Sequence, residues 1–380
     1  MKKLTKLLLG VLLLLPTIVK AEEYPSLYSI IKDNTSGNTH ITAPSNFVGI
    51  TELTEKDKKV YVYTGYDNNG NKNVNNYAVI GNLCFRILRT TYTEGVKLTY
   101  YGKYKNNECN EKEIIEDQYN EENDKDIYVG YMYGNNHENA TDSNIKIKLD
   151  NWYIDNLMDY SSWMDDAIYC NDRTSEPDYG YEGSDATRFK RYNNKSDASL
   201  SCPKNDAFTV KNEDGNKALT YPIGSISADE AIMTANSGNY SWLTKDSYNY
   251  YTLTPRHYTP VSGEGNYMYN SQVANDLNDE LSTKWGGEIL PVISVTNEIL
   301  VKDGDGTQPN PYILIKRVPP PPTTTTTTTT SKEIITGSDE VENPPTGVYN
   351  YIWILPIIVL GGYIAYELIK NKKHFKAINK

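Results

Sequence analysis

The chain of 380 residues has few histidines and cysteines, the side chains on which zinc sites and many nucleophilic catalytic sites depend. Its four histidines are scattered, and no H-E-x-x-H or C-x-x-C spacing predicts a zinc site. A G-x-S-x-G stretch, which is typical of serine hydrolases, is also absent from the sequence. The sequence therefore argues against zinc and serine-hydrolase chemistry, and we expect a non-catalytic protein without a cofactor, although calcium stays possible because the chain is rich in Asp, Asn and Glu.

Basic residues are also scarce away from the chain ends. The whole chain has 38 Lys and Arg against 49 Asp and Glu, and nine of the basic residues lie before residue 22 or after residue 347. The segment between these limits holds 29 basic and 48 acidic side chains, a formal charge of −19. Phosphate contacts need a cationic surface, so nucleic acid is not an expected partner.

Long apolar runs are confined to the two ends of the chain. At the start, Lys2, Lys3 and Lys6 precede an apolar stretch from Leu7 to Val19, and the small residue Ala21 follows it. This order predicts a signal peptide, residues 1–21, that is cut after Ala21. A retained N-terminal membrane helix is the alternative.

The C-terminal run extends from Val348 to Tyr366 and carries no formal charge over its 19 residues. As a helix it would span about 28 Å, close to the thickness of a bilayer core. A short lysine-rich tail stays on the cytoplasmic side of a membrane, so we expect the rest of the chain to lie outside the cell. The lysines of this tail are Lys370, Lys372, Lys373, Lys376 and Lys380.

The pentapeptide NPPTG directly before this run resembles the sorting signal of surface proteins from monoderm bacteria. In that family a sortase cuts between the residues that match Thr346 and Gly347, and it joins the threonine carbonyl to the cell wall. The resemblance implies sortase and peptidoglycan as partners and the extracellular face of the cell as the location. The family usually has Leu where this chain has Asn343, and an uncleaved membrane anchor is the alternative. The full motif is Asn343, Pro344, Pro345, Thr346 and Gly347.

A low-complexity stem, residues 318–342, separates this signal from the rest of the chain. Its sequence, VPPPPTTTTTTTTSKEIITGSDEVE, has too few large apolar side chains to form a core. Its prolines favour polyproline II, in which 25 residues extend on the order of 75 Å. We expect a spacer that follows one domain, residues 61–317, and its irregular N-terminal lead-in, residues 22–60.

The expected domain has strands at both ends and helices between them. Alternating apolar and polar residues predict strands, and Asp142 or Ser143 can cap a helix whose apolar face includes Ile145, Leu149, Trp152, Tyr153 and Leu157. A second helix is predicted after Ser227, because Ser227 and Glu230 have capping-box spacing. This order is typical of an α+β fold with its chain termini in one sheet. The predicted strands are Lys59–Tyr66, Asn76–Thr91, Gly95–Tyr104, Tyr250–Pro255, Glu288–Val295 and Pro311–Lys316.

The segments NYAVIGNLCFRILRTT, IDNWYIDNL, LTYPIGSISADEAIM, YYTLTP, EILPVISV and GDGTQPNPYIL occur in this order between Tyr61 and Lys316. In this order they resemble a module, without an assigned function, of surface proteins from gut Bacillota. That module is similar to the C-type-lectin-like fold shared with formylglycine-generating enzymes, and the resemblance implies this fold here. The chain departs from the module at Tyr251 and Thr254, where Trp and Ser are usual, and at Leu290, where Arg is usual.

The cysteines Cys84, Cys109, Cys170 and Cys202 are an even set, which predicts disulfides outside the cell. Three connectivities are open. The resemblance favours Cys84–Cys109 and Cys170–Cys202, because each pair closes a local loop across segments that the module keeps together. Paired in this way, the cysteines leave no catalytic thiol. The alternative is a reactive or copper-binding pair, as in the formylglycine-generating enzymes, but no cysteine here matches such a site.

A calcium requirement is left open by the sequence. The stretch DGDGTQPNPY, residues 303–312, lacks the acidic residues that an EF-hand loop has after its first positions. Its QPN triplet resembles a lectin calcium motif, but no Trp-Asn-Asp follows it, so we interpret the stretch as a turn. Paired carboxylates such as Asp165 and Asp166 are expected to be solvated surface in so acidic a chain.

Tyrosine is the one aromatic residue in excess, at 33 against five Phe and five Trp. Its ring offers an apolar face and its hydroxyl stays hydrated, which suits recognition surfaces. The alternative is biased composition, with alternating tyrosines on one buried strand face. The loop Lys245–Asn270 concentrates tyrosines around a cationic pair, and its candidate ligand residues are Tyr248, Tyr251, Arg256, His257, Tyr258 and Tyr267.

Together these features predict a wall-displayed, adhesin-like binding protein that engages an extracellular glycan or protein. Two other classes stay open: a structural wall protein without a discrete ligand, and an enzyme built on a lectin-like fold. A saturable ligand would distinguish the first class from the second, and metal- or oxygen-dependent turnover would mark the third.

Overall fold

A computed structural model describes most of the chain between Tyr24 and Arg317. The chain divides into two units, Met1–Pro319 and Pro320–Lys380, and all described residues belong to the first. No helix in this described part is long and apolar enough to cross a membrane. The predicted signal peptide, stem, sorting signal and membrane span lie outside the described residues. These residues are 24–41, 43–66, 74–122, 125–135, 138–174, 198–237, 241–243, 250–261, 265–272 and 280–317.

Ten of the described strands form the central sheet, with the order β12-β17-β5-β4-β3-β19-β18. Strand β2 pairs with both β1 and β4, and β6 extends the sheet from β5. β19 runs parallel to β3, whereas the other pairs in this sheet are antiparallel. The strands are β1 (Gly49–Glu55), β2 (Lys58–Thr64), β3 (Tyr77–Ile80), β4 (Leu83–Thr90), β5 (Val96–Lys105), β6 (Glu108–Lys112), β12 (Ile223–Gly224), β17 (Val292–Val295), β18 (Ile299–Asp303) and β19 (Tyr312–Lys316).

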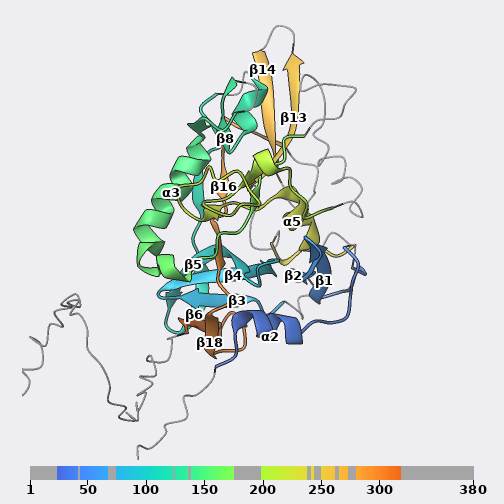
Figure 1. Cartoon of the computed structure of the whole chain (residues 1–380), viewed down its shortest axis with the longest axis vertical. Helices are drawn as coiled ribbons and strands as arrows, with labels where there is room; N and C mark the ends of the chain where they lie inside the picture. Colours follow the sequence, from blue (N-terminus) through green and yellow to red (C-terminus); the bar gives the residue numbers. More distant parts are fainter. Residues whose placement is uncertain are drawn as a thin grey trace, which may run out of the picture. The chain divides into compact units, whose positions relative to one another are not determined.

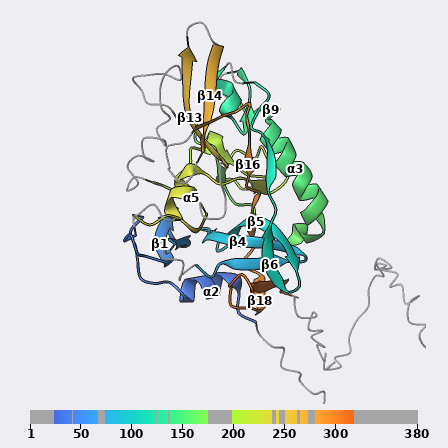
Figure 2. The same ribbon diagram turned by 180° about the vertical axis from the view of Figure 1, so that it is seen from behind.

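Smaller sheets and short helices surround this sheet. Figure 1 and Figure 2 show α2 beside β1 and β18 at one end of the unit, with the β13–β14 hairpin at the other end. The helices are α2 (Leu27–Asp33), α3 (Asn144–Leu157), α5 (Ala228–Met233), η1 (Asp126–Val129), η3 (Met158–Trp163) and η5 (Lys204–Asp206). The other strands are β7 (Ile115–Gln118), β8 (Met132–Tyr133), β9 (Thr141–Asp142), β10 (Tyr169–Cys170), β11 (Ala207–Phe208), β13 (Tyr251–Val261), β14 (Gly265–Gln272), β15 (Glu280–Ser282) and β16 (Gly286–Ile289). The described residues thus form a mixed α+β fold with mainly antiparallel sheets, and strands from both ends of the described chain lie in one sheet.

Two predicted strands are each divided in the structure. The stretch Asn76–Thr91 forms the hairpin β3–β4, because Gly81 adopts a φ of +60° in a two-residue connection. The stretch Glu288–Val295 is interrupted at Pro291, which has no backbone N–H for a sheet ladder. As a result β16 pairs with β7 while β17 pairs with β5.

Both predicted helices are confirmed, with their caps. The Ser143 side chain accepts from the backbone N–H of Lys146 at the start of α3. At α5, Ser227 and Glu230 form both halves of the capping box. Four residues of the predicted apolar face of α3 are buried, whereas the fifth, Trp152, is half-buried against Tyr100 with ring centroids 4.8 Å apart. The buried four are Ile145, Leu149, Tyr153 and Leu157.

The N-terminal lead-in is more regular than the sequence suggested. Residues 24–60 contain α2 and β1, and the expected boundary between residues 60 and 61 falls inside β2. Leu27 and Ile31 of α2 and Ile50 and Leu53 of β1 belong to the main core. α2 has only seven residues, which is too short to give a clear helical period. This stretch is therefore part of the folded unit.

The expected cysteine pairing is confirmed. Cys84 of β4 bonds to Cys109 of β6 with a Cα–Cα distance of 5.8 Å, and Cys170 bonds to Cys202 at 5.9 Å. The first bridge packs in a small buried cluster with Tyr77 and the neighbouring apolar side chains. Disulfides persist in oxidising surroundings, so this pairing is consistent with an extracellular protein.

Candidate functional site

The segment predicted as a tyrosine-rich ligand loop is largely a β-hairpin. Arg256, His257 and Tyr258 lie in β13 and Tyr267 lies in β14, while Tyr248 lies outside the described residues. In the backbone register Tyr258 pairs with Met268, and Tyr267 pairs with Thr259. The segment was predicted as a ligand loop because tyrosines are concentrated there, whereas its described residues are largely paired strands, in which side chains alternate between the two faces.

Tyr251, the remaining residue of that candidate set, is a core residue. Its side chain is fully buried, and its hydroxyl oxygen lies 2.7 Å from the carbonyl oxygen of Ser282 and 2.5 Å from that of Trp285. Its ring meets Tyr119 edge-on, with centroids 5.4 Å apart. A tyrosine held in this way packs as an aromatic core residue, so Tyr251 is removed from the candidate ligand contacts.

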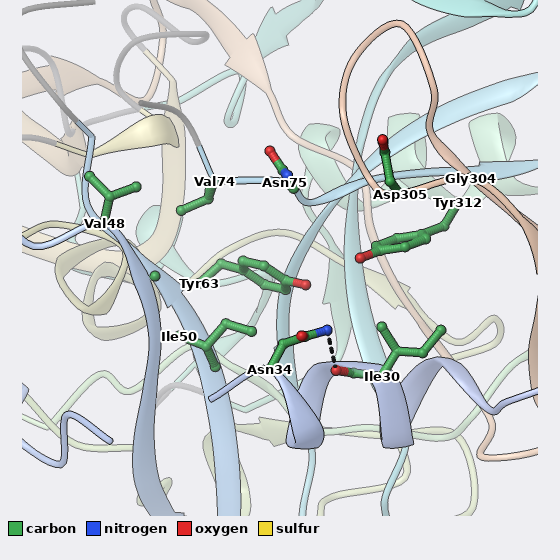
Figure 3. A pocket seen from close by; sticks show the side chains of 11 residues that line it. Ile30, Asn34, Val48, Ile50, Tyr63, Val74, Asn75, Gly304, Asp305 and Tyr312 are labelled. Carbon is green, nitrogen blue, oxygen red and sulfur yellow. Dashed lines mark hydrogen bonds between the residues drawn. The ribbon is translucent and has the colours of Figure 1, made fainter. Parts of the chain in front are cut away.

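A cavity of about 580 Å³ lies on one side of α2, at the other end of the unit from the hairpin. It is bounded by α2, by β1 and β2, and by the loop that joins β18 to β19, as Figure 3 shows. This volume is within the range of small-molecule sites in proteins. The lining residues are Ile30, Asn34, Val48, Gly49, Ile50, Tyr63, Val74, Asn75, Gly304, Asp305 and Tyr312.

Two tyrosine hydroxyls point toward one another across this cavity (Figure 3). Tyr63 comes from β2 and Tyr312 from β19, and their side chains are 4% and 7% exposed. Within the described part of the chain no hydrogen bond is made by either hydroxyl. Burial raises the pKa of both phenols. Both therefore stay neutral at physiological pH and can donate as well as accept.

Amide and carboxylate groups line the rim of the cavity. Asn34 donates its side-chain N–H to the carbonyl of Ile30 at 2.9 Å, which fixes the amide and leaves its oxygen as an acceptor. Asn75 is exposed and makes no side-chain hydrogen bond in the described residues. The Asp305 carboxylate accepts from the N–H and the hydroxyl of Thr307, which lowers the pKa of Asp305. The rim therefore presents acceptors beside the two phenolic donors.

The β18–β19 loop that carries Asp305 is a tight turn. Gly304 has a φ of +93°, and a Cβ at this position would lie 2.0 Å from the carbonyl oxygen of Pro311. The backbone N–H groups of Asp305 and Gly306 both donate to the carbonyl of Asn310. Only glycine fits such an approach, so this turn fixes where the carboxylate and Tyr312 meet the cavity.

The cavity supplies donors, acceptors and aromatic faces, but none of its lining residues is a cysteine, histidine, serine or lysine. No group of three or more His, Cys, Asp or Glu side chains in the described ranges is placed to hold a metal ion. Apolar walls from Ile30, Val48 and Ile50 complete the lining. Such a surface suits a ligand with many hydroxyl groups and apolar ring faces.

The adjacent carboxylates Asp165 and Asp166 are not solvated surface, contrary to expectation. Asp165 accepts from the hydroxyl of Thr93 at 2.7 Å, and burial raises its pKa. Asp166 accepts from the backbone N–H groups of Val210, Lys211 and Asn212, at 2.5–2.7 Å. Both side chains therefore hold loops together, a role that residue type alone could not reveal.

Comparisons with protein-family models, with curated proteins and with solved structures found no match to this chain. The candidate site thus rests on geometry alone. The excess of tyrosine directed attention to the densest cluster of tyrosines, residues 245–270, and not to Tyr63 and Tyr312, which line the cavity. What marks these two residues is that they converge from strands 249 positions apart in sequence, which no local pattern shows.

Proposed function

We propose that this chain is a non-catalytic, adhesin-like binding protein displayed on the cell surface, and that the cavity beside α2 binds an extracellular glycan. The observation that carries the proposal is the pair of buried phenols, Tyr63 and Tyr312, whose hydroxyls face each other without a partner in the described residues. A saccharide hydroxyl placed between them would accept from one and donate to the other. Asn34, Asn75 and Asp305 would bind further hydroxyls at the rim.

The proposed location is the extracellular face of a monoderm bacterium. Two disulfides support an oxidising compartment. The NPPTG motif, the apolar run and the lysine tail support attachment to peptidoglycan by a sortase, with the Pro/Thr-rich stem as spacer. The C-type-lectin-like fold is the finer proposal for the folded unit, and the mixed, mainly antiparallel sheet with strands from both ends of the described chain supports it.

The binding proposal is tested with the full chain, purified in detergent, on an array of host and bacterial glycans. Binding is measured with calcium and with a chelator, because the sequence leaves a calcium requirement open. We expect a saturable glycan hit that weakens when Tyr63 and Tyr312 are both replaced by Phe. A hit that the double variant keeps, but that a Tyr258→Ala, Tyr267→Ala variant loses, would move the site to the β13–β14 hairpin. No hit with folded protein would favour a structural wall protein.

The anchoring proposal has its own test. Thr346→Ala removes the residue whose carbonyl would be joined to the wall, so the variant should stay in the membrane fraction. The unaltered chain should be released from cells only by a muramidase. Equal distribution of both proteins between wall and membrane fractions would show that NPPTG is not processed.

A further inference from the structure

A second cavity, of about 570 Å³, lies on the opposite side of α2 from the tyrosine pair. Tyr28 and Lys32 of α2 line it, one turn apart, just as Ile30 and Asn34 line the first cavity. Tyr61 and Tyr63 are two positions apart on β2 and lie one in each cavity. Helix α2 therefore divides two sites that share strand β2.

Cationic side chains are concentrated in this second cavity. Lys32, Lys58 and Lys59 line it against a single lining carboxylate, Glu94. The surrounding chain is strongly acidic, with a formal charge of −19 between residues 22 and 347. A local excess of positive charge in such a chain focuses the field on one place and attracts anions there.

Local structure explains how the three lysines meet. Lys32 lies in the last turn of α2, where a cation is favoured by the helix dipole. Lys58 and Lys59 open β2 directly after the two-residue turn at Lys56 and Asp57, where both residues have a positive φ. The turn and the helix end thus bring both lysine groups to the same cavity.

Two of these lysines are available for a ligand. Lys59 pairs with Glu52 at 2.9 Å, whereas Lys32 and Lys58 have no ion-pair partner in the described residues. All three side chains are exposed. The available charge is therefore positive even when the carboxylate of Glu94 is counted.

Aromatic rings form the walls around this charge. Tyr28 and Tyr61 meet edge-on, with ring centroids 6.2 Å apart. The Tyr92 ring is held in place, because its hydroxyl donates to Asp214 and accepts from Asn212, each at 2.8 Å. Lys56 lies over the same ring, 4.9 Å from its centroid. Tyr28 and Tyr92 are half-buried and leave part of their rings to the cavity, whereas Tyr61 is only 3% exposed and packs behind Tyr28. The accessible parts of Tyr28 and Tyr92 are of the kind on which a sugar ring packs.

We propose that this lysine–tyrosine cavity binds an acidic saccharide, one that carries a sulfate or carboxylate group on its ring. The cations at Lys32 and Lys58 contact the anionic group, and the tyrosine rings contact the sugar. A nucleic acid is a poor fit, because a long polyanion would extend from this cavity over the acidic surface around it. The proposal is independent of the first cavity, which has no cationic side chain in its lining.

The test is titration of the full chain, purified in detergent, with a heparin-derived oligosaccharide, with an oligogalacturonate and with the desulfated form of the first. We expect saturable binding of at least one acidic probe, weaker at high salt, and little binding of the neutral form. The triple variant Lys32→Gln, Lys58→Gln, Lys59→Gln should bind that probe about tenfold more weakly, since each exposed ionic contact adds little alone. Glu94→Gln should bind it more tightly.

A charge-matched control uses Lys125→Gln, Lys211→Gln and Lys302→Gln, three exposed lysines that do not line the cavity. Equal weakening in the control and in the site variant would show a diffuse charge effect and overturn the proposal. Absence of binding to both acidic probes would overturn it as well. Inorganic sulfate that binds as tightly as the oligosaccharide would show an anion site without a saccharide. The Tyr63→Phe, Tyr312→Phe variant of the first cavity should bind the acidic probe as tightly as the unaltered chain does. Loss of acidic binding in that variant would place the acidic saccharide in the first cavity and overturn the proposal.

Discussion

The hydroxyl groups of Tyr63 and Tyr312 face each other across the cavity beside α2, although one residue comes from β2 and the other from β19 (Figure 3). Burial raises the pKa of both phenols, and the neighbouring Tyr312 raises the pKa of Tyr63 further. In the described residues nothing satisfies these two hydroxyls. Neither hydroxyl oxygen is among the fully buried side-chain atoms of the described residues that lack a hydrogen-bond partner, so both reach the open cavity, where water or a ligand hydroxyl can bond them.

Removing either hydroxyl should weaken glycan binding without weakening the fold. Tyr63→Phe and Tyr312→Phe each remove one ligand hydrogen bond, about 1 kcal/mol or roughly a fivefold increase in Kd. Tyr251→Phe is the matched control, because its hydroxyl bonds buried carbonyls and not the cavity. That variant should lower the unfolding midpoint and keep the Kd. Calorimetric titration and urea unfolding measure both quantities, and a Tyr63→Phe protein that unfolds early with an unchanged Kd would contradict the assignment.

Four charged side chains form a buried network between the sheet and α5. The Arg89 guanidinium donates to both carboxylate oxygens of Glu55 at 3.0 Å and to Glu230 at 2.8 Å. Lys97 donates to the same Glu230 oxygen at 2.7 Å and to the carbonyl of Ile168. Two cations and two anions balance in a region where each is at most 5% exposed. Such a network is costly to break, because the remaining partner stays buried and unpaired.

Glu230→Gln should destabilise the protein by about 3–5 kcal/mol, since it leaves Lys97 and Arg89 with one carboxylate between them. The glutamine can still accept from the Ser227 N–H, so the loss is chiefly electrostatic. Glu213→Gln is the control, because Glu213 forms an exposed pair with Lys217 and should change stability little. Chemical denaturation compares the two variants, and equal midpoints would show that the buried network adds no stability.

Acid should weaken the fold through the same carboxylate. Burial alone would raise the pKa of Glu230, but Lys97 and Arg89 lower it from 4.5 to about 2. Burial lowers the pKa of Lys97 despite this contact, and the carboxylate remains ionised because two cations flank it. A folded pKa below the unfolded one stabilises the fold above about pH 4.5, and this gain is lost as the pH falls toward 2. The loss should be on the order of 3 kcal/mol.

The measurement for this pH dependence is denaturant unfolding at several pH values from neutral down to 2. The free energy of unfolding should fall between about pH 4.5 and pH 2. In Glu230→Gln the same fall should be smaller, because that titrating group is gone. A curve for the variant that runs parallel to that of the unaltered chain would assign the acid sensitivity to other carboxylates.

Local patterns predicted the elements of this fold better than their ends. The capping residues Ser143 and Ser227 start their helices as expected, because a cap is a contact within one turn. The breaks at Gly81 and Pro291 were missed, although glycine and proline are the residues that interrupt strands. Apolar residues stand close to each break on both sides, so each stretch resembles one continuous strand.

The candidate sites were harder to predict than the elements. Tyrosine content indicated recognition, but it could not separate Tyr251, which is a core residue, from Tyr63, which faces a cavity. Both lie in apolar stretches of strand. The lysines of the second cavity come from α2 and from the start of β2, and all three lie within residues 22–60, which we expected to be an irregular lead-in. The tertiary fold brings them together, because Tyr28 of α2 meets Tyr61 of β2.

The disulfide Cys84–Cys109 should stabilise the fold by about 3–4 kcal/mol, because it closes a loop of 25 residues' separation in the unfolded chain. Cys84→Ala with Cys109→Ala should lower the free energy of unfolding by this amount, and reductant, which opens both bridges, should lower it by more in the unaltered chain. Cys170→Ala with Cys202→Ala is the matched comparison, with a separation of 32 residues and a nearly equal expected loss. Urea unfolding measures both losses, and thiol alkylation before unfolding checks that no cysteine is free.

The Cys84–Cys109 bridge also joins β4 to β6 across β5 and lies in a buried aromatic cluster, so its removal should in addition loosen the packing around Tyr77 and Tyr101. Amide hydrogen exchange of β5 and β6 should therefore rise in the first variant and not in the second, and a rise in both would mean that the two bridges stabilise the unit only through the unfolded chain.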